Sequence, residues 1–517
     1  MKPKNIFSPL NLTYMSMSIF FICLIYFLYI NLKFFHLPIV EDHAFRQTQT
    51  ALTAFYLLKN GFSLAYETPV IGQNWSIPLE FPIYQSIVAF LVHLGSSNLS
   101  ITGRAVNLIF TMLTCIPYYY SLRLLKIQSS AIFFCMALFI STPVYLFWGG
   151  TFMIEGAALF FTLAFFYYSL VLINKSTANY QYLLFILFLT AGLLQKITTT
   201  LPVLAVMVIF YLVTFYKSNS KSYLAFIKAI FSVLIALSIA YGWILFSDSV
   251  KLNNPIGVGL TSSAMSGWNY GSLADRVSKK LWVTTIYLRS IAESSFYFFG
   301  LLSIFSSLIF LKDNSAKKAI VLFSFLFILP FLIFTNLHIR HNYYQFSNLI
   351  FLSAAVGISI TYLVQQLKFQ LRAFYKPTLF LIMCIFIFYN ITFFKVGSLN
   401  SKIYAPNSDA KTTLILTDFI KKNTPVGSYV IWLTKMGWSS EFAFFSERKS
   451  LTGENQGSTP SDMIIHWDKY LQSKPKGIVF CPPEDKNNTD LFSSAIQRTF
   501  KGYQYSEIEN CSIYIAP

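Results

Sequence analysis

Long apolar runs, each nearly free of charged residues, recur through the first three quarters of the chain. The first is LTYMSMSIFFICLIYFLYINL, at residues 12–32. Because about 20 apolar residues in an α-helix cross the hydrocarbon core of a bilayer, this pattern predicts a polytopic α-helical membrane protein. We predict 11 transmembrane helices, near residues 12–33, 103–123, 129–147, 155–173, 180–195, 198–216, 224–246, 294–311, 319–335, 346–364 and 377–394.

The basic residues in the short loops between these helices predict the orientation. Loops that stay in the cytoplasm carry an excess of lysine and arginine, and the basic loops all fall on one side if the N-terminus is cytoplasmic. The residues concerned are Lys2, Lys4, Arg123, Lys126, Lys175, Lys217, Lys221, Lys228, Lys312, Lys317, Lys318, Lys368, Arg372 and Lys376. An odd number of spans then places the C-terminus outside. The expected location is the bacterial cytoplasmic (inner) membrane.

Three longer polar segments fall on the outer side in this topology. The first, about 34–102, contains two stretches that resemble interfacial helices, HAFRQTQTALTAFYLL and a second one opened by Pro82. A second loop spans about 247–293. The tail has short apolar runs at 428–433, 476–480 and 511–516, typical of strands, and helical patterns at 409–423 and 461–473. The predicted domains are therefore a membrane domain, 1–394, and an extracytoplasmic α/β domain, 395–517.

Composition agrees with a membrane protein and limits the remaining classes. The chain is 55% hydrophobic and only 12% charged, about half the charge of a typical soluble protein. Its formal net charge of +18 comes mainly from lysine in the cytoplasmic loops, so we expect no nucleic-acid partner. The six cysteines form no metal-like cluster. Cys481 and Cys511, both in the polar tail, are able to pair if the tail is extracytoplasmic.

Acidic residues are rare and cluster at the predicted outer surface. Residues 1–394 contain nine, and only Asp313 falls on the cytoplasmic side. Glu41 and Asp42 follow the first span, and Glu155 begins the fourth, so the three carboxylates could face one cavity. Acids beside membrane spans are costly and tend to be functional. The structural alternative is that they favour helix N-termini electrostatically or as caps.

Cations and aromatic residues accompany these acids on the same side. Arg46 lies in the first outer loop, Arg104 begins the second span and Lys196 lies at the turn between two short spans. The segment HIRHNYYQF adds Arg340, His341, Tyr343 and Tyr344. Arginine and lysine suit phosphate, whereas the alternatives are snorkelling to lipid headgroups and an aromatic belt. His338 and His341 have no acidic partner near them in sequence that would complete a metal site.

The ordered set of these segments resembles a known family. Five segments are similar to segments of the GT-C membrane glycosyltransferases, in the protein mannosyltransferase and aminoarabinose transferase group. They are FRQTQTA (45–51), LEFPIYQ (79–85), GRAVNLIF (103–110), GLLQKITT and HNYYQF. The matches cover most of the membrane part in the right order. One departure is Glu80-Phe81-Pro82, where aminoarabinose transferases carry lysine-proline-proline, which leaves the donor-phosphate ligands open.

The resemblance implies an inverting transfer of a sugar from a polyprenyl-phosphate carrier to a lipid, glycan or protein acceptor at the outer face of the membrane. It implies a carboxylate base, which maps to Asp42 or Glu41 with Asp42 favoured, and Glu155 orienting the acceptor or a cation. Implied phosphate ligands are Lys196, Arg46, Arg104 and Arg340. Glu80, His341, Tyr343 and Tyr344 are the implied substrate-binding residues.

The resemblance requires no cofactor and no metal, although a divalent cation between carboxylates remains compatible with it. Two other functions stay open. A transporter or flippase of lipid-linked sugars would place its acids on a midplane pathway with internal symmetry, and the sequence shows no repeat. A polysaccharide polymerase or ligase would use diphosphate-linked glycans and outer-loop arginines, for which Arg276, Arg289 and Arg340 are available.

Overall fold

The computed structural model describes residues 12–96, 98–174, 178–217, 222–371, 374–404, 408–455, 459–482 and 489–517. The chain divides into two compact units. Unit 1 contains residues 1–35, 104–241 and 266–401, and unit 2 contains residues 36–103, 242–265 and 402–517. The predicted loop residues Lys2, Lys4, Lys175, Lys221 and Arg372 lie outside the described part of the chain.

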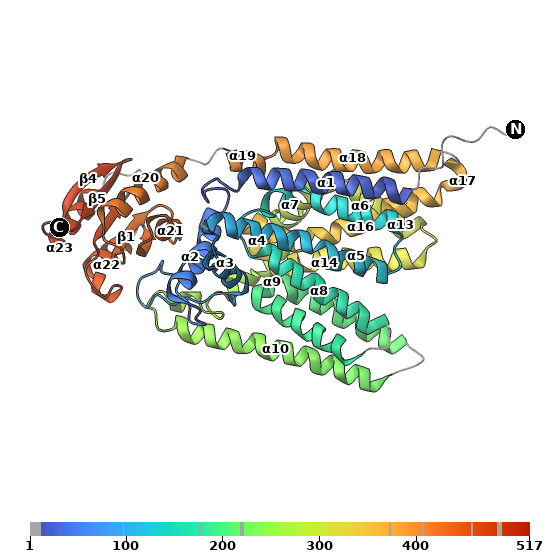
Figure 1. The fold of residues 1–517 in the computed structure, drawn as a ribbon, viewed down its shortest axis with the longest axis horizontal. Helices are drawn as coiled ribbons and strands as arrows, with labels where there is room; N and C mark the ends of the chain where they lie inside the picture. The colour runs from blue at the N-terminus through green and yellow to red at the C-terminus, as the bar shows by residue number, and fades with distance from the viewer. Residues whose placement is uncertain are drawn as a thin grey trace. The chain divides into compact units, whose positions relative to one another are not determined.

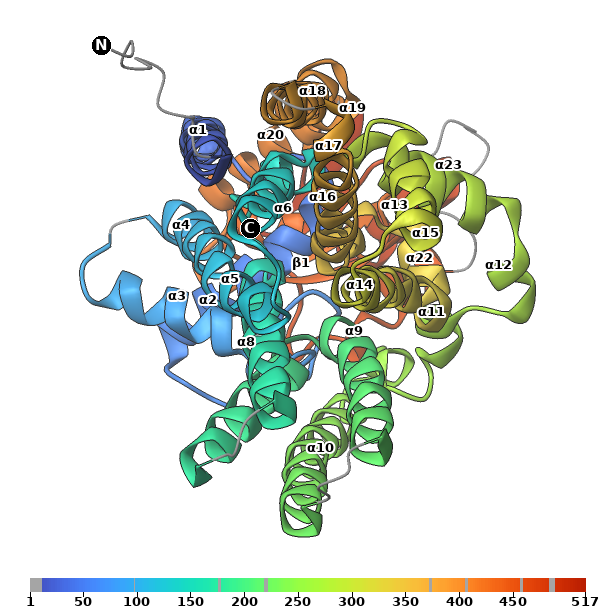
Figure 2. The same cartoon turned by 90° about the vertical axis from the view of Figure 1, so that its right-hand side faces the viewer.

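Unit 1 is a bundle of long apolar helices (Figures 1 and 2). Its helices are α1 (Leu12–Phe34), α4 (Leu99–Leu113), α5 (Cys115–Leu124), α6 (Ser129–Ser141), α7 (Pro143–Trp148), α8 (Glu155–Asn174), α9 (Asn179–Lys217), α10 (Tyr223–Lys251), α11 (Ser266–Tyr270), α12 (Leu273–Val277), the π-helical η2 (Lys280–Ala292), α13 (Phe299–Phe310), α14 (Asn314–Ile333), α15 (Thr335–Arg340), the 3-10 helix η3 (Asn342–Ser347), α16 (Leu349–Gln366), α17 (Lys368–Leu371), α18 (Tyr375–Val396) and α19 (Ser398–Tyr404). Helices α4, α10 and α19 run across the division between the units.

Eight helical segments among the described residues are long and apolar enough to cross a membrane. The molecule is therefore a mostly helical, multi-pass membrane protein, as the sequence predicted. Every predicted span overlaps a helix, but α6 and α13 are shorter than a full crossing. The predicted count of 11 spans stays a prediction.

Helix α9 contains two of the predicted spans and doubles back between them. Lys196 has non-helical backbone angles, φ −162° and ψ 96°, in the middle of its 39 residues. A Cβ on Gly192 would lie 2.7 Å from the Thr200 hydroxyl, eight residues later in the chain. Eight residues of straight helix span about 12 Å, so the two halves must run alongside each other. The tight turn predicted at Lys196 is confirmed.

The basic loops of unit 1 gather at one end of the bundle. Figure 1 shows the start of α1, the end of α5, the α13–α14 connection and α17 at the same end. Lys126, Lys312 and Lys368 belong to these segments. Their common position agrees with the predicted arrangement of basic loops, whereas the side of the membrane stays a prediction.

Unit 2 contains a five-stranded sheet in the order β2-β1-β3-β5-β4. The strands are β1 (Tyr429–Thr434), β2 (Lys449–Glu454), β3 (Gly477–Phe480), β4 (Gln504–Ile508) and β5 (Cys511–Ile515), and the first three are mutually parallel. The helices of this unit are α2 (Ala44–Asn60), α3 (Ile83–His93), η1 (Gly257–Leu260), α20 (Ser408–Asn423), α21 (Glu441–Ser446), α22 (Thr459–Ile465), η5 (Trp467–Lys469) and α23 (Thr489–Thr499). The α/β character predicted for the tail is confirmed.

Side chains alternate between the two faces of the sheet and form two cores. Ile431 and Ile478 pack with the helix α23 residue Ile496 on one face, whereas Val430 and Val479 pack with Leu416 of α20 on the other. This alternation follows from the two-residue period of a strand. Strands β2 and β4 were not predicted, because SLTGE and QYSEI carry few apolar residues.

Part of the first outer loop pairs with the sheet. Ile71 forms an antiparallel bridge with Leu451, and the Ser450 and Thr452 amides donate to the carbonyls of Pro69 and Val70. These bonds satisfy the outer edge of β2, which would otherwise expose unpaired backbone groups. Residues 36–103 thus fold with the tail rather than as a separate loop, while the predicted domain boundary at 394/395 stays a prediction.

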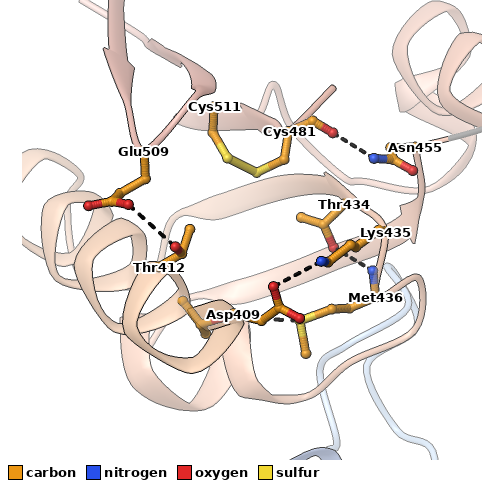
Figure 3. The surroundings of a disulfide bond; sticks show 10 residues. Asp409, Thr412, Thr434, Lys435, Met436, Asn455, Cys481, Glu509 and Cys511 are labelled. Carbon is orange, nitrogen blue, oxygen red and sulfur yellow. Dashed lines mark hydrogen bonds and ion pairs between the residues drawn. A yellow bond between two sulfur atoms is a disulfide. The ribbon is translucent and has the colours of Figure 1, made fainter. Parts of the chain in front are cut away.

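A disulfide joins Cys481, directly after β3, to Cys511, the first residue of β5 (Figure 3). The pairing considered from the sequence is present, and it is compatible with an oxidising compartment outside the cytoplasm. The four other cysteines are free.

We predict that replacing both Cys481 and Cys511 by alanine lowers the free energy of unfolding by about 2–4 kcal/mol, because the bond closes a loop of 30 residues. Limited proteolysis of the full chain in detergent should then cleave the tail sooner. The matched control is Cys384→Ala, which removes a free cysteine; equal sensitivity of both variants would contradict the prediction.

Candidate active site

A buried ion pair joins two distant parts of unit 1. Nζ of Lys196 lies 2.5 Å from Oε1 of Glu155, and their side chains are 8% and 3% exposed. Lys196 occupies the turn of the α9 hairpin, and Glu155 is the first residue of α8. A lysine buried to this extent does not snorkel to the membrane surface. The alternative of lipid-headgroup contact is therefore wrong for this residue.

Two tyrosines of η3 complete the surroundings of Lys196. Its Nζ lies 4.1 Å from the ring centroid of Tyr344 and 5.2 Å from that of Tyr343. Electron-rich ring faces attract an ammonium group, so the lysine is held as a cation by one carboxylate and two rings. The fold thus brings together four predicted site residues from three separate segments. We call Glu155, Lys196, Tyr343 and Tyr344 the lysine cage.

His338 lies beside the lysine cage and was not among the predicted site residues. Its side chain is 1% exposed, and its ring packs 4.5 Å from Phe331 and 5.8 Å from Tyr344, centroid to centroid. Neither ring nitrogen has a hydrogen-bond partner among the described residues. Burial, reinforced by Lys196 and Arg289, lowers the pKa of His338 to about 3. The imidazole is therefore neutral at physiological pH.

The other predicted residues of unit 1 occupy different positions. Arg340 is exposed at the end of α15, where its Nε lies 3.4 Å from Asn336 and its guanidinium 5.9 Å from the Trp268 ring. Neither of these two contacts of Arg340 involves Lys196. His341 stacks on Tyr343 at 5.3 Å. Arg104 is only 2% exposed in α4, so snorkelling is wrong for it too.

Unit 2 contains the predicted acid pair. Oδ2 of Asp42 lies 2.8 Å from Nζ of Lys402, and Glu41 is 8% exposed. Helix α2 begins at Ala44 with His43 in the N-cap position and without a side-chain cap. The residue in the N-cap position is thus His43 rather than either acid, while the alternative that the acids favour this helix N-terminus electrostatically stays a prediction. No sequence pattern pointed to Lys402, which is 360 residues away from Asp42.

Asp42 lines a pocket of about 360 Å³ within unit 2, which we call the acid pocket. Its walls include Glu41, Asp42, Lys402, Asp409 and Glu441. Burial, and secondly the charge of Asp409, raises the pKa of Glu441 to about 7 against a hydrogen bond from Ser439. The pocket therefore combines several carboxylates with a lysine and accommodates a polar ligand.

Arg46 and Glu80 form a second ion pair of unit 2, with 3.1 Å between Nη2 and Oε2. Gln49 accepts from the same guanidinium at 3.1 Å, and Gln85 donates to Glu80 at 2.9 Å. This network joins α2 to the start of α3. Glu80 thus fixes the orientation of Arg46. The sequence difference at Glu80, where aminoarabinose transferases carry lysine-proline-proline, did not predict this ion pair.

The residues described hold no group of three histidine, cysteine, aspartate or glutamate side chains that could bind a metal. That the protein requires no cofactor stays a prediction.

Comparison with solved structures identifies the fold. No family profile matches the chain, and no curated protein sequence matches it. Among solved structures, ArnT from Cupriavidus metallidurans bound to undecaprenyl phosphate superposes with a TM-score of 0.62 at 9% identity, covering 95% of this chain and 97% of ArnT. The Archaeoglobus fulgidus oligosaccharyltransferase, in complex with Zn and sulfate, gives 0.54 at 11%, covering 96% and 73%. All of these are GT-C proteins. The chain has the GT-C glycosyltransferase fold.

A further GT-C structure is the arabinofuranosyltransferase AftD from Mycobacteria, with a TM-score of 0.57 at 11% identity. The likeness covers 96% of this chain but 40% of AftD. At such low identities the comparisons establish the GT-C fold and leave each residue's role to its own geometry.

The lysine cage generates a prediction about stability. Glu155→Gln leaves a buried lysine without its carboxylate and should lower the free energy of unfolding by about 3–5 kcal/mol. The double variant Glu155→Gln with Lys196→Met removes both charges and should recover most of this loss. Thermal unfolding in detergent measures both; a double variant less stable than Glu155→Gln alone would contradict the ion-pair interpretation.

His338 generates a prediction about pH. Below its ordinary pKa of 6.5 the unfolded chain gains a proton at this position while the folded chain does not, so stability falls as the pH drops from 6.5 towards about 3. In His338→Phe this contribution should vanish, and the melting temperature should fall less steeply over that interval. His466→Phe, at an exposed histidine, is the control; an unchanged slope in His338→Phe would refute the assignment.

Proposed function

We propose that this GT-C protein is an inverting glycosyltransferase that moves a sugar from a polyprenyl-phosphate carrier to an acceptor hydroxyl on the outer face of the membrane. The observation that carries the proposal is Asp42, a carboxylate in a pocket wall and held by a lysine, directly after the first span of a GT-C fold. The crystal structure of ArnT bound to undecaprenyl phosphate supports the choice of carrier.

In the proposed reaction Asp42 is the general base. An acceptor hydroxyl attacks the anomeric carbon, its proton passes to the Asp42 carboxylate, and the bond from the anomeric carbon to the phosphate oxygen breaks. The polyprenyl phosphate leaves with the bonding electrons. One displacement inverts the configuration at the anomeric carbon. Nζ of Lys402, 2.8 Å from Oδ2 of Asp42, holds the carboxylate in position.

Lys196 is the proposed cation for the leaving phosphate. It carries one positive charge in an environment of low exposure, where electrostatic stabilisation is stronger than in water. Glu155 and the tyrosines hold its position. Lys196 and Arg46 are each paired with a carboxylate, but the side chain of Lys196 is the less exposed of the two, at 8% against 14%. Arg340 is exposed. We therefore rank Lys196 above both as a phosphate ligand.

An apolar groove in unit 1 supports a lipid-linked donor. It has a volume of about 230 Å³ between α8, α9 and α10, and its walls include Phe165, Leu204, Met207 and Phe226. Such a lining suits a hydrocarbon chain. Of the arginines that would serve a polymerase or ligase, Arg276 donates to the backbone carbonyl of Leu332, which gives it a structural role.

The test measures transfer of radiolabelled sugar from a panel of polyprenyl-phosphate sugars in membranes containing the protein. Asp42→Asn should lower the rate about 10²–10⁴-fold, the usual contribution of a general base. Glu41→Gln should retain most activity, because Glu41 is not assigned the proton transfer. The folding control is Asp418→Asn, an exposed member of an ion pair on α20.

The two variants also distinguish the assignments. Full activity in Asp42→Asn with loss in Glu41→Gln would transfer the role of base to Glu41. Absence of transfer from every donor in the panel, with cell-envelope extract supplied as a source of acceptors, would overturn the proposed function itself.

A further inference from the structure

The sheet of unit 2 has a topological switch point. From β1 the chain passes to β2 on one side, whereas from β3 it continues towards β4 and β5 on the other side. The connections leaving the carboxyl ends of β1 and β3 therefore diverge. In open α/β sheets a crevice forms at such a point, and ligands bind there. The topology alone thus selects the end of the sheet marked by Thr434 and Cys481.

A cavity of about 530 Å³ lies at this location. Thr434, the last residue of β1, lines it together with Lys435 and Met436, and Cys481 lines it directly after β3. Helix α20 contributes Asp409, Thr412 and Thr413 to the opposite wall (Figure 3). We call this cavity the strand-end groove. It is larger than the acid pocket and belongs to a part of the chain to which the proposed catalysis assigns no role.

The lining of the strand-end groove mixes hydrogen-bond donors and acceptors with apolar surface. Asp409 and Lys435 form an ion pair of 2.9 Å, and Thr412 lies 3.5 Å from Glu509. Figure 3 shows these groups around the disulfide. Leu416 and Phe442 add apolar surface. Such a combination fits a ligand that offers many hydroxyl groups and some apolar faces, as a sugar does.

Charge decides between ligand classes. The groove contains two carboxylates, Asp409 and Glu509, and one lysine, Lys435, so it would repel a phosphate or an acidic glycan. Its polar groups would remain unsatisfied against a lipid chain. An uncharged oligosaccharide carries no negative charge that the carboxylates would repel, and its hydroxyl groups can form hydrogen bonds with the polar groups of the groove.

The groove and the acid pocket are neighbours within unit 2. Asp409 and Met436 line both of them. A ligand that occupies the groove is thereby adjacent to the pocket that contains Asp42. This relation gives the groove a direction: one end of a bound chain lies towards the proposed base.

We propose that the strand-end groove binds an uncharged oligosaccharide segment and that this segment belongs to the acceptor. The proposal that an oligosaccharide binds is argued from the lining of the groove alone, whereas the proposal that it belongs to the acceptor rests on the proposed function. The disulfide between Cys481 and Cys511 fixes one wall by tying the end of β3 to the start of β5. The Asp409–Lys435 pair supplies an acceptor and a donor to sugar hydroxyls on the other side.

The test uses the full chain in detergent and photoreactive tetrasaccharides of mannose, galactose and N-acetylglucosamine as probes. After irradiation, mass spectrometry identifies the labelled peptides. At least one probe should bind saturably and label peptides that contain residues 409–416 or 434–436. Labelling confined to other peptides, or no saturable binding by any probe at millimolar concentration, would overturn the proposal.

Matched variants test the lining. Lys435→Met should weaken binding about tenfold by removing a charged hydrogen-bond donor. Lys422→Met is the control, because Lys422 is equally exposed and pairs with Asp418 of the same helix, outside the groove. Thr412→Trp should abolish binding by filling the cavity. Equal affinities of Lys435→Met and Lys422→Met, with Thr412→Trp still binding, would refute the site.

The probe-binding and sugar-transfer measurements distinguish a failure of the oligosaccharide site from a failure of the proposed function. Asp42→Asn should bind the probe normally while losing transfer. Probe binding without transfer from any donor would retain the oligosaccharide site and reject its role as the acceptor site. Transfer activity unaffected by Thr412→Trp would likewise remove the acceptor role while leaving the proposed function in place.

Discussion

The buried ion pair between Lys196 and Glu155 is the constraint on which the membrane unit depends. A charge that leaves water loses several kcal/mol of solvation, so it persists only with a close partner of opposite charge. Glu155 at the start of α8 and the turn of the α9 hairpin supply this geometry. The tyrosines of η3 cover the ammonium group with ring faces. The result is a cation in a fixed position, as its proposed role beside a leaving phosphate requires.

The second unit brings several carboxylates near one another around one pocket. The first outer loop folds with the tail by adding residues 69–72 to the edge of β2. This pairing fixes the segment that contains Asp42 relative to the α/β sheet, because both belong to unit 2. Lys402 forms an ion pair with Asp42, and the raised pKa of Glu441 lowers the total negative charge of the acid pocket near neutral pH.

Several candidate site residues could be selected from the sequence, because charged groups are costly in a membrane and therefore conspicuous. Glu155, Lys196 and the acid pair were selected as charges at the predicted outer surface, and all of them are buried or line a pocket. Lys402 and Glu441 were missed, since a lysine and a glutamate in a polar tail look like ordinary surface residues. His338 was considered only for metal binding, and its burial among aromatic rings was not visible in the sequence.

The sequence by itself determined the class of the molecule, because a bilayer permits few solutions. Long apolar runs must be helices, since their backbone groups find no water to bond with. The turn at Lys196 and the strands β1, β3 and β5 of the tail followed from local pattern. Only the tertiary structure decided which charges meet, that Arg46 is bound by Glu80, and that Asp42 faces Lys402. Those pairings join residues that are 34 and 360 positions apart, and no local pattern encodes a contact over such distances.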